Sequence, residues 1–408
     1  MKPLIPWRDA LARVTHVVRP APSVSAPVEV RTMGTILAED VHAHWDFPSA
    51  DVSVMDGYAA RAADLVAPAA LLRRVGESAA GHPMDGPLPT GACARISTGA
   101  VLPEGADLVI PQEDVEVRDE GQTIAVDLQA FGEVTPGRWV RRRGSEVGEG
   151  EVVLEAGRRL GPADLAVAAS TGNTTLRVHP RPRVAVVSTG DELVPRGAVP
   201  PPGQVVSSND LLLAAAVVEV GAIPVDCGIA PDDPEGLRQT LARALSCDFV
   251  VTTGGISVGD HDLVARTFEA LGITWDVHGI LLRPGKPLAF GSGEGRHVFG
   301  LPGNPASAWV TFSLFVAPAL RRHMGVRGSG LPPTVPVRLR NAAKGAGRRA
   351  HLVRAQLHED GTATVLRSQT SGDVRSMGGA DALIEVPAQT AELPAGTETH
   401  AFVLGPRS

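Results

Sequence analysis

The sequence predicts a multidomain protein in which a central parallel three-layer α/β domain is joined to β-rich domains. The chain has 408 residues, which is too long for one ordinary core. Between residues 181 and 327, short apolar runs alternate with helical stretches, as they do in parallel α/β sheets. Before and after that segment, runs of Val and Ile are broken at short intervals by Gly, Pro and Asp, a pattern typical of small β domains.

The N-terminal part is expected to begin with a helix and to be interrupted by a β-rich insertion. Apolar residues recur at helical spacing within residues 8–18, and a Pro and Ser cluster follows. Residues 44–144 have little helical periodicity and form the predicted β-rich domain. Gly161 and Pro162 indicate a helix start, so we expect residues 145–180 to rejoin residues 1–43 in one helical and extended N-terminal domain.

The second half of the chain is expected to hold the α/β domain, over residues 181–327, and a small β-barrel, over residues 328–408. Strands of the α/β domain are predicted at 184–187, 249–252 and 297–300, with helices at 211–220 and 237–245. A Gly and Pro cluster at 328–336 forms the linker. Strands of the barrel are predicted at 335–339, 351–357, 362–366 and 383–386.

Composition excludes several classes of protein. A formal net charge of -7 argues against a general nucleic-acid binder, and a small anion would need a local cationic pocket or a metal ion. The three cysteines stand far apart, so neither a zinc signature nor a disulfide framework is indicated. The N-terminus has no apolar signal core and no stretch is long enough to span a bilayer, so we expect a cytoplasmic protein without membrane association.

Three turns at expected strand ends indicate a phosphate-binding site. They lie at 188–192, 252–262 and 301–307 and are rich in Gly or polar residues. Ligands of open parallel sheets collect at the carboxyl ends of the strands, where Gly allows close backbone approach and helix N-termini attract anions. Alternatively, each turn is a simple connection. None matches the Walker loop or the GxGxxG fingerprint.

Acidic residues in these turns suggest a metal ion. Asp191 and Glu192 stand in the first turn, and Asp260 and Asp262 in the second. Carboxylates repel a phosphate unless a hard cation lies between them, and Mg²⁺ is commonly held by one or two carboxylates plus phosphate oxygens. Helix capping is the alternative, and for Asp232 and Asp233 before Pro234 it explains the residues equally well.

A basic turn lies nearby in the sequence. Arg283 and Lys286 enclose Pro284 and Gly285, which suits a compact oxyanion. An ordinary solvated turn is an equally good interpretation of two basic residues.

Read in order, eight short segments resemble the molybdopterin molybdenumtransferase family, the MoeA-type enzymes related to the E domain of gephyrin. The match spans nearly the whole chain. The segments are 54–59 (VMDGYA), 95–99 (RISTG), 103–111 (PEGADLVIP), 141–144 (RRRG), 188–193 (STGDEL), 253–262 (TGGISVGDHD), 283–287 (RPGKP) and 301–307 (LPGNPAS).

The resemblance implies a homodimer of four-domain subunits, with a β-rich domain of one subunit closing over the α/β domain of the other. Such an enzyme takes molybdate and adenylylated molybdopterin, cleaves the phosphoanhydride with help from Mg²⁺, releases AMP and leaves molybdenum on the dithiolene sulfurs. A molybdopterin adenylyltransferase and molybdenum-enzyme acceptors are possible partners. No protein nucleophile is required.

By motif position, the resemblance implies catalytic roles for Asp56, Thr98, Glu192, Asp232, Asp262 and Arg283. Glu192 and Asp262 would also hold the metal, while Asp56 and Thr98 would face the molybdate. Without the resemblance, Asp56 could form a tight turn by bonding to its own backbone, and a turn residue is the better interpretation of Thr98. Substrate contacts are implied for Ser188, Thr189, Gly190, Gly254, Gly255, Ser257, Gly259, Lys286, Pro302, Gly303, Asn304, Pro305, Arg354 and Ser371.

The chain departs from the family at the basic turn. Relatives usually carry Lys where Gly279 and Arg283 stand here, so one positive charge is missing and the other is a planar guanidinium. Two further hypotheses remain: an adenylyltransferase that makes the nucleotide adduct, or a non-catalytic scaffold. Pyrophosphate release would distinguish the first, and ligand binding without metal dependence the second.

Overall fold

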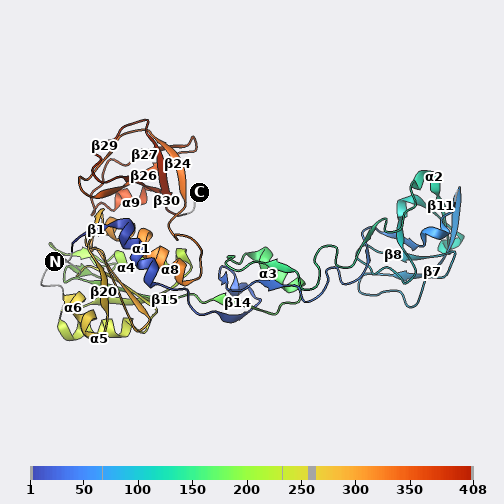
Figure 1. Ribbon diagram of the computed structural model, residues 1–408, viewed down its shortest axis with the longest axis horizontal. Helices are drawn as coiled ribbons and strands as arrows, with labels where there is room; N and C mark the ends of the chain where they lie inside the picture. The colour runs from blue at the N-terminus through green and yellow to red at the C-terminus, as the bar shows by residue number, and fades with distance from the viewer. Residues whose placement is uncertain (1–2, 67, 232, 256–262, 406–408) are drawn as a thin grey trace. The chain divides into compact units, whose positions relative to one another are not determined.

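The computed structural model describes residues 3–66, 68–231, 233–255 and 263–405. The chain forms two compact units (Figure 1). Unit 1 comprises residues 1–24, 34–38 and 177–408, and unit 2 comprises residues 25–33 and 39–176. The finer division into four domains stays a prediction.

A six-stranded sheet forms the centre of the α/β part of unit 1. Its order is β18 (Ile223–Ala230), β15 (Arg183–Thr189), β19 (Phe249–Thr253), β23 (Arg296–Leu301), β22 (Ala289–Gly293) and β20 (Thr274–His278). The first four strands are parallel, as predicted. The prediction of a purely parallel sheet is wrong at one strand, because β22 runs antiparallel to both of its neighbours, β23 and β20. The reason is the two-residue connection of Glu294 and Gly295, both at positive φ, which is the geometry of a tight hairpin.

Helices cover both faces of this sheet and confirm the three layers (Figure 1). Successive residues of a strand point to opposite faces, so Val184 and Val186 of β15 pack in one core, and Ala185 and Val187 in the other. The first core includes α1 (Trp7–Val17), α4 (Asn209–Val220), α7 (Pro305–Thr311) and α8 (Ala317–His323); the second includes α5 (Pro234–Ala244) and α6 (Leu263–Ala270). A π-helical turn, Phe312–Val316, joins α7 to α8.

The C-terminal β-barrel is confirmed. Strands β26 (Ala350–Leu357), β27 (Thr362–Val365), β24 (Thr334–Leu339), β30 (Glu398–Val403) and β28 (Ala382–Val386) follow one another, and β28 pairs back with β26 to close the barrel. A short pair, β25 (Ala343–Lys344) and β29 (Glu392–Leu393), stands beside it.

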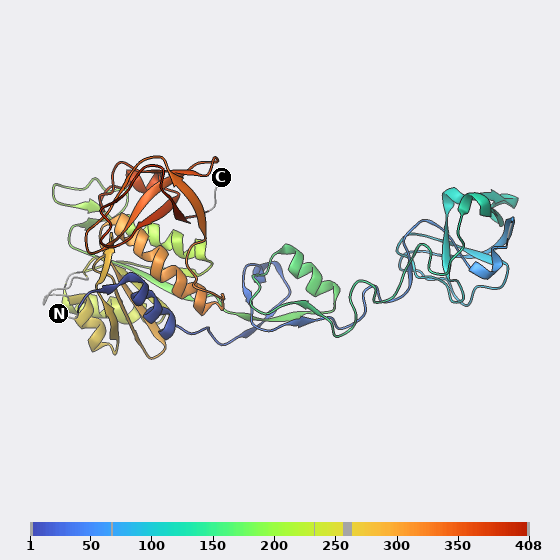
Figure 2. The ribbon, with the colours of Figure 1, turned by 45° about the horizontal axis from the view of Figure 1, so that its top comes forward.

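Two strands from outside the C-terminal segment extend the barrel sheet. β21 (Ile280–Arg283) pairs with β26, and β1 (Ile5–Pro6) pairs with β21, both in parallel. The first helix also contacts the barrel, because Trp7 Nε1 donates to Glu385 Oε1 at 3.0 Å. Figure 2 shows the barrel lying against the helices of the α/β part. The basic turn therefore follows a strand, β21, that lies between the N-terminal strand β1 and the barrel strand β26.

Unit 2 contains the β-rich segment predicted for residues 44–144. Its six-stranded sheet has the order β10 (Val115–Arg118), β11 (Thr123–Asp127), β7 (Ala69–Ser78), β8 (Ala92–Ile96), β6 (Gly57–Ala60) and β9 (Leu108–Pro111). Smaller elements are β4 (Val41–His42) with β13 (Val152–Leu154), β5 (Val52–Ser53) with β12 (Val140–Arg141), α2 (Leu128–Phe131) and α3 (Pro162–Ser170). The predicted start of α3 at Gly161 is confirmed, and Asp164 Oδ2 accepts from the Gly161 N–H at 2.7 Å.

No helix among the described residues is long and apolar enough to cross a membrane.

Candidate active site

The three predicted turns lie at the carboxyl ends of adjacent parallel strands. β15 ends at Thr189, β19 at Thr253 and β23 at Leu301. Ser188 and Thr189 are buried there: Ser188 Oγ lies 3.4 Å from Thr253 Oγ1, and Thr189 Oγ1 donates to the Thr253 carbonyl at 3.2 Å. Because both hydroxyls are engaged inside the protein, they hold the strand ends together rather than presenting a nucleophile.

The second turn requires glycine. At Gly254, with φ of +79°, a Cβ atom would lie 2.4 Å from the Thr189 carbonyl oxygen. At Gly255, with φ of +62°, it would lie 2.5 Å from Val264 Cγ2. Contacts this short do not occur, so the first two turns can approach each other closely only because glycine has no Cβ atom.

The third turn connects the α/β sheet to the barrel. Gly303 and Asn304 are exposed, Pro302 is buried, and Pro305 is the first residue of α7. Asn304 Nδ2 donates to Ser371 Oγ at 3.0 Å, and the Ala306 N–H donates to the Ser371 carbonyl at 3.1 Å. The structure therefore brings together two predicted residues that are far apart in sequence, Asn304 and Ser371.

Asn209 is a site residue that the sequence interpretation missed. It begins α4, and its Nδ2 donates to the Gly303 carbonyl at 2.7 Å, which links that helix to the third turn. The only sequence signal was a polar run, residues 207–210, directly before an apolar helix. That signal predicts a helix start but gives no indication of a partner more than 90 residues away.

The predicted acids are only partly described. Glu192 is exposed at the end of the first turn, and its carboxylate lies close to Gly190. Asp233 caps α5 by accepting from the Gly236 N–H at 2.8 Å, as the capping alternative predicts. Asp232 and Asp262, together with Ser257 and Gly259, lie outside the described residues. Within the described ranges, no group of three or more His, Cys, Asp or Glu is placed to hold a metal.

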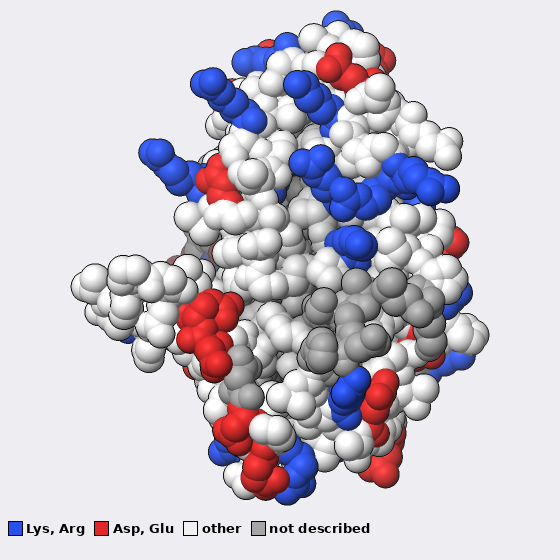
Figure 3. Space-filling view, turned by 90° about the vertical axis from the view of Figure 1, so that its left-hand side faces the viewer, with Lys and Arg blue, Asp and Glu red and all other residues white. Residues whose placement is uncertain are grey.

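The basic turn presents two exposed cations on this side of unit 1. Arg283 is the last residue of β21, and Lys286 follows after a turn that packs Gly285 against Thr311. Neither takes part in an ion pair with another described residue. Figure 3 shows a face of the molecule on which several Lys and Arg side chains gather. Unpaired cations in a chain of net negative charge suit an anionic ligand.

Arg354 lies behind the site rather than in it. It is fully buried, and its Nη2 donates to the Thr370 carbonyl at 2.9 Å and to the Ser368 carbonyl at 3.3 Å. Burial lowers the pKa of its guanidinium, and the charge of Asp373 opposes that change. The side chain therefore holds the segment that leads to Ser371. Direct substrate contact by Arg354 stays a prediction.

In unit 2, the structure brings Asp56 and Thr98 together. Asp56 precedes β6 and Thr98 follows β8, and those strands pair antiparallel. Asp56 Oδ1 accepts from the Thr98 N–H at 2.7 Å and from Thr98 Oγ1 at 3.0 Å. The Thr98 backbone bond is the main cause that lowers the pKa of this exposed carboxyl. Asp56 thus bonds across the sheet instead of to its own turn.

The chain is similar to known proteins over most of its length. The chain matches models of the MoeA N-terminal region, domains I and II, over residues 5–172, a probable molybdopterin binding domain over 185–322, and the MoeA C-terminal region, domain IV, over 336–404. It is 36% identical over 366 residues to a molybdopterin molybdenumtransferase from Nostoc, covering 87% of this chain and 83% of that protein. Gephyrin from Dictyostelium discoideum is 30% identical over 433 residues, covering 92% of this chain and 59% of gephyrin. A molybdopterin biosynthesis MoeA protein from Pyrococcus horikosii superimposes with a TM-score of 0.86 at 33% identity, covering 99% of this chain and 100% of the other.

Proposed function

This chain belongs to the molybdopterin molybdenumtransferase family, and from that premise we propose that it inserts molybdate into adenylylated molybdopterin, with help from Mg²⁺ and with release of AMP. It is an enzyme of molybdenum cofactor biosynthesis, a transferase related to gephyrin. The observation that carries the finer proposal is the edge of the α/β sheet. Unit 1 holds the three turns and the exposed carboxylate of Glu192, and it also holds Arg283 and Lys286, which form no ion pair with another described residue.

The turns supply backbone groups for the phosphates of the substrate. At Gly254 and Gly255 the second turn approaches its neighbours too closely for a Cβ atom, and the Gly254 N–H is bonded to the Leu301 carbonyl. Other backbone N–H groups after these strand ends would therefore bind the phosphate oxygens. Arg283 and Lys286 add positive charge that stabilises negative charge developing on an oxyanion. Fixed donors of this kind need no reorganisation during the reaction.

The oxygen donors near the first turn fit a hard divalent cation. Glu192 is exposed and makes no ion pair with another described residue, so its carboxylate is free to bind a metal. We propose that Glu192 and Asp262 hold Mg²⁺, whose role is to polarise the phosphoanhydride. Asp232 belongs to the same proposed set.

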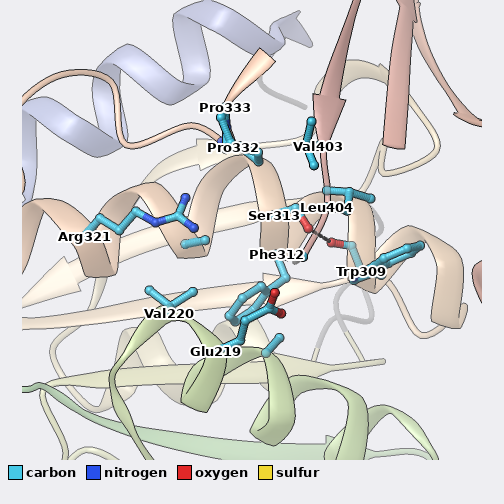
Figure 4. A pocket seen from close by; sticks show the side chains of 13 residues that line it. Glu219, Val220, Trp309, Phe312, Ser313, Arg321, Pro332, Pro333, Val403 and Leu404 are labelled. Atoms are coloured by element: carbon cyan, nitrogen blue, oxygen red, sulfur yellow. Dashed lines mark hydrogen bonds between the residues drawn. The ribbon is translucent and has the colours of Figure 1, made fainter. Parts of the chain in front are cut away.

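We further propose a homodimer in which Asp56 and Thr98 of one subunit complete the site of the other. Exposed apolar surface on unit 1 supports a second copy. Helix α4 carries a single charged residue after its first turn, and Leu211 and Val218 are 56% and 60% exposed. A hollow of about 440 Å³ adjoins this helix, with Phe312 and Trp309 in its wall, Pro332 and Pro333 on one side and Glu219 on the other (Figure 4).

Light scattering tests the dimer. Leu211→Glu combined with Val218→Glu should give monomers that keep the circular dichroism spectrum of the parent chain. A double variant that remains dimeric would show that this face is not the interface. We also propose a cytoplasmic location, with an adenylyltransferase supplying the substrate and molybdenum enzymes accepting the product.

The reaction is tested by AMP release from adenylylated molybdopterin in the presence of molybdate and Mg²⁺. Glu192→Ala should abolish Mg²⁺-dependent release while the protein stays folded. Glu398→Ala, an exposed acid on the barrel, is the matched control and should have no effect. Unchanged turnover in Glu192→Ala would refute the metal assignment, and pyrophosphate formed from ATP and molybdopterin would identify an adenylyltransferase instead.

A further inference from the structure

Two further cations lie near the basic turn, on the barrel side. Lys344 ends β25, and Arg349 stands directly before β26. Like Arg283 and Lys286, they form no ion pair with any residue in the described part of the chain. Exposed arginines elsewhere in the chain, such as Arg338 and Arg340, do pair with acids. Within the described part of the chain, the lack of ion pairs for these four cations is therefore a local feature.

A buried histidine lies in the middle of these cations. His351 of β26 is directly opposite Arg283 of β21 in the parallel register, so the two side chains leave the same face of the sheet. Its side chain is almost entirely covered, with 3% of the residue exposed. Nδ1 lies 2.7 Å from the Lys344 carbonyl oxygen.

The hydrogen bonds of His351 fix its tautomer. A carbonyl oxygen can only accept, so Nδ1 carries the proton and, in the neutral ring, Nε2 has a bare lone pair. Nε2 is buried and has no hydrogen-bond partner among the described residues. A buried acceptor without a donor costs free energy, and this nitrogen is the natural place for a second proton.

The described residues whose charges act on His351 are all positive. Burial is the main cause that lowers its pKa; the Lys344 carbonyl opposes this, and Arg283, Arg354 and Arg349 lower the pKa further. Neighbouring strands supply no compensating acid: β1 contributes Ile5 and Pro6, and on β28 the carboxylate of Glu385 is bound to Trp7 and Arg8. The imidazole is therefore neutral at neutral pH in the free protein.

We propose that Lys344, Arg349 and His351 extend the oxyanion site of Arg283 onto the barrel, and that His351 takes up a proton when a dianionic oxyanion binds there. This proposal deepens the proposed function and rests on it for the identity of the oxyanion. His351 acts as a titrating, positioning residue behind Arg283, and it does not contact the reacting atoms.

The coupling between proton uptake and oxyanion binding determines how affinity changes with pH. A bound dianion favours the charged imidazole, so the pKa of His351 is higher in the complex than in the free protein. Between those two values binding takes up a proton, and affinity rises as pH falls, by at most about tenfold per pH unit. Below the lowered pKa of the free protein, the ring is already charged and this dependence ends.

Calorimetry of the full-length protein tests the proposal. Molybdate binding is measured between about pH 5 and 8, where histidines titrate, in buffers with different ionisation enthalpies that report proton uptake. Sulfate, which does not itself titrate in this range, is the second probe. The parent chain should take up a fraction of a proton per oxyanion and bind more tightly at lower pH. His351→Asn keeps a donor for the Lys344 carbonyl but cannot become charged, so it should lose both effects.

Two further variants make the result decisive. His358→Asn, at a histidine that contacts Thr364 elsewhere on the barrel, should behave like the parent chain. Arg349→Met should weaken oxyanion binding and move proton uptake to higher pH, because a neighbouring positive charge is removed; this test does not require any change at the buried histidine. Equal proton uptake by the parent chain, His351→Asn and Arg349→Met at every pH would overturn the proposal. If oxyanion binding is linked to proton uptake but the protein does not release AMP, the proposed function is contradicted and the oxyanion site is supported.

Discussion

Replacing Arg354 with Met should change the free energy of unfolding only slightly but should reduce the order of the segment that leads to Ser371. Loss of the guanidinium removes its two hydrogen bonds, to the carbonyls of Thr370 and Ser368. A hydrogen bond from a charged donor contributes about 1.5–3 kcal/mol, so this loss costs roughly 3–6 kcal/mol. The carbonyls belong to partly exposed residues, which water can reach.

An opposing contribution comes from the donors that Arg354 leaves unused. Its Nε and Nη1 are buried without a partner among the described residues. Each unmade bond costs about 1–3 kcal/mol, so removing both relieves roughly 2–6 kcal/mol. Since Met fills much of the same volume, we expect the free energy of unfolding to change by no more than about 2 kcal/mol.

The site, in contrast, should lose order. Without Arg354 the segment 368–370 has fewer anchors, and Ser371 no longer reaches Asn304 reliably. Urea denaturation measures the stability, amide hydrogen exchange over residues 366–372 measures local order, and AMP release measures the function. Arg338→Met, which breaks only an exposed ion pair on the same barrel, is the control. A loss of more than about 4 kcal/mol, or unchanged exchange in this segment, would refute the reasoning.

Three further predictions concern other parts of the chain. Gly254→Ala should cost at least about 1–2 kcal/mol from its backbone conformation alone, and should reduce AMP release because the added Cβ meets the Thr189 carbonyl; a fully active variant would show that the turn is not tightly packed. Asp56→Ala should leave unit 2 folded but lower molybdate-dependent turnover. Hydrogen bonding lowers the pKa of Asp56, so the contribution of this carboxylate to stability should be present above pH 3.8 and be lost as the pH falls through the lowered pKa. An acid titration followed by NMR measures this loss. Burial lowers the pKa of His297 from 6.5 to about 4, so between these pH values the unfolded chain binds a proton that the folded chain does not. The free energy of unfolding should therefore decrease by roughly 3 kcal/mol at most as the pH falls from 6.5 to about 4. His297→Gln should remove that part of the pH dependence in urea titrations.

Local patterns were sufficient to predict most of the fold. Apolar periodicity predicted β15, β19, β23, α4 and α5 of the α/β part and β24, β26, β27 and β28 of the barrel, and Gly161 with Pro162 predicted α3. The reversed strand β22 was not predicted, because an apolar strand has the same pattern in either direction. The short turn at Glu294 and Gly295 was the available signal, since two such residues favour a hairpin over a crossover.

The site was predictable as a set of residues but not as a set of contacts. Asp56 and Thr98 were both predicted, yet their bond depends on the pairing of β6 with β8. Asn209 and His351 were missed because their partners, Gly303 in the third turn and Arg283 on β21, are distant in the sequence. No periodicity in a sequence encodes such pairings.

The pairing of β21 with the barrel limits how this protein can be divided. The sequence predicts a domain boundary near residue 328, but β21 precedes that boundary and pairs with β26, which follows it. Exchange of the C-terminal segment between relatives would therefore leave Arg283 on a strand whose neighbour comes from a foreign chain. A chimaera that keeps the oxyanion site intact must transfer β1, β21 and the barrel as one piece.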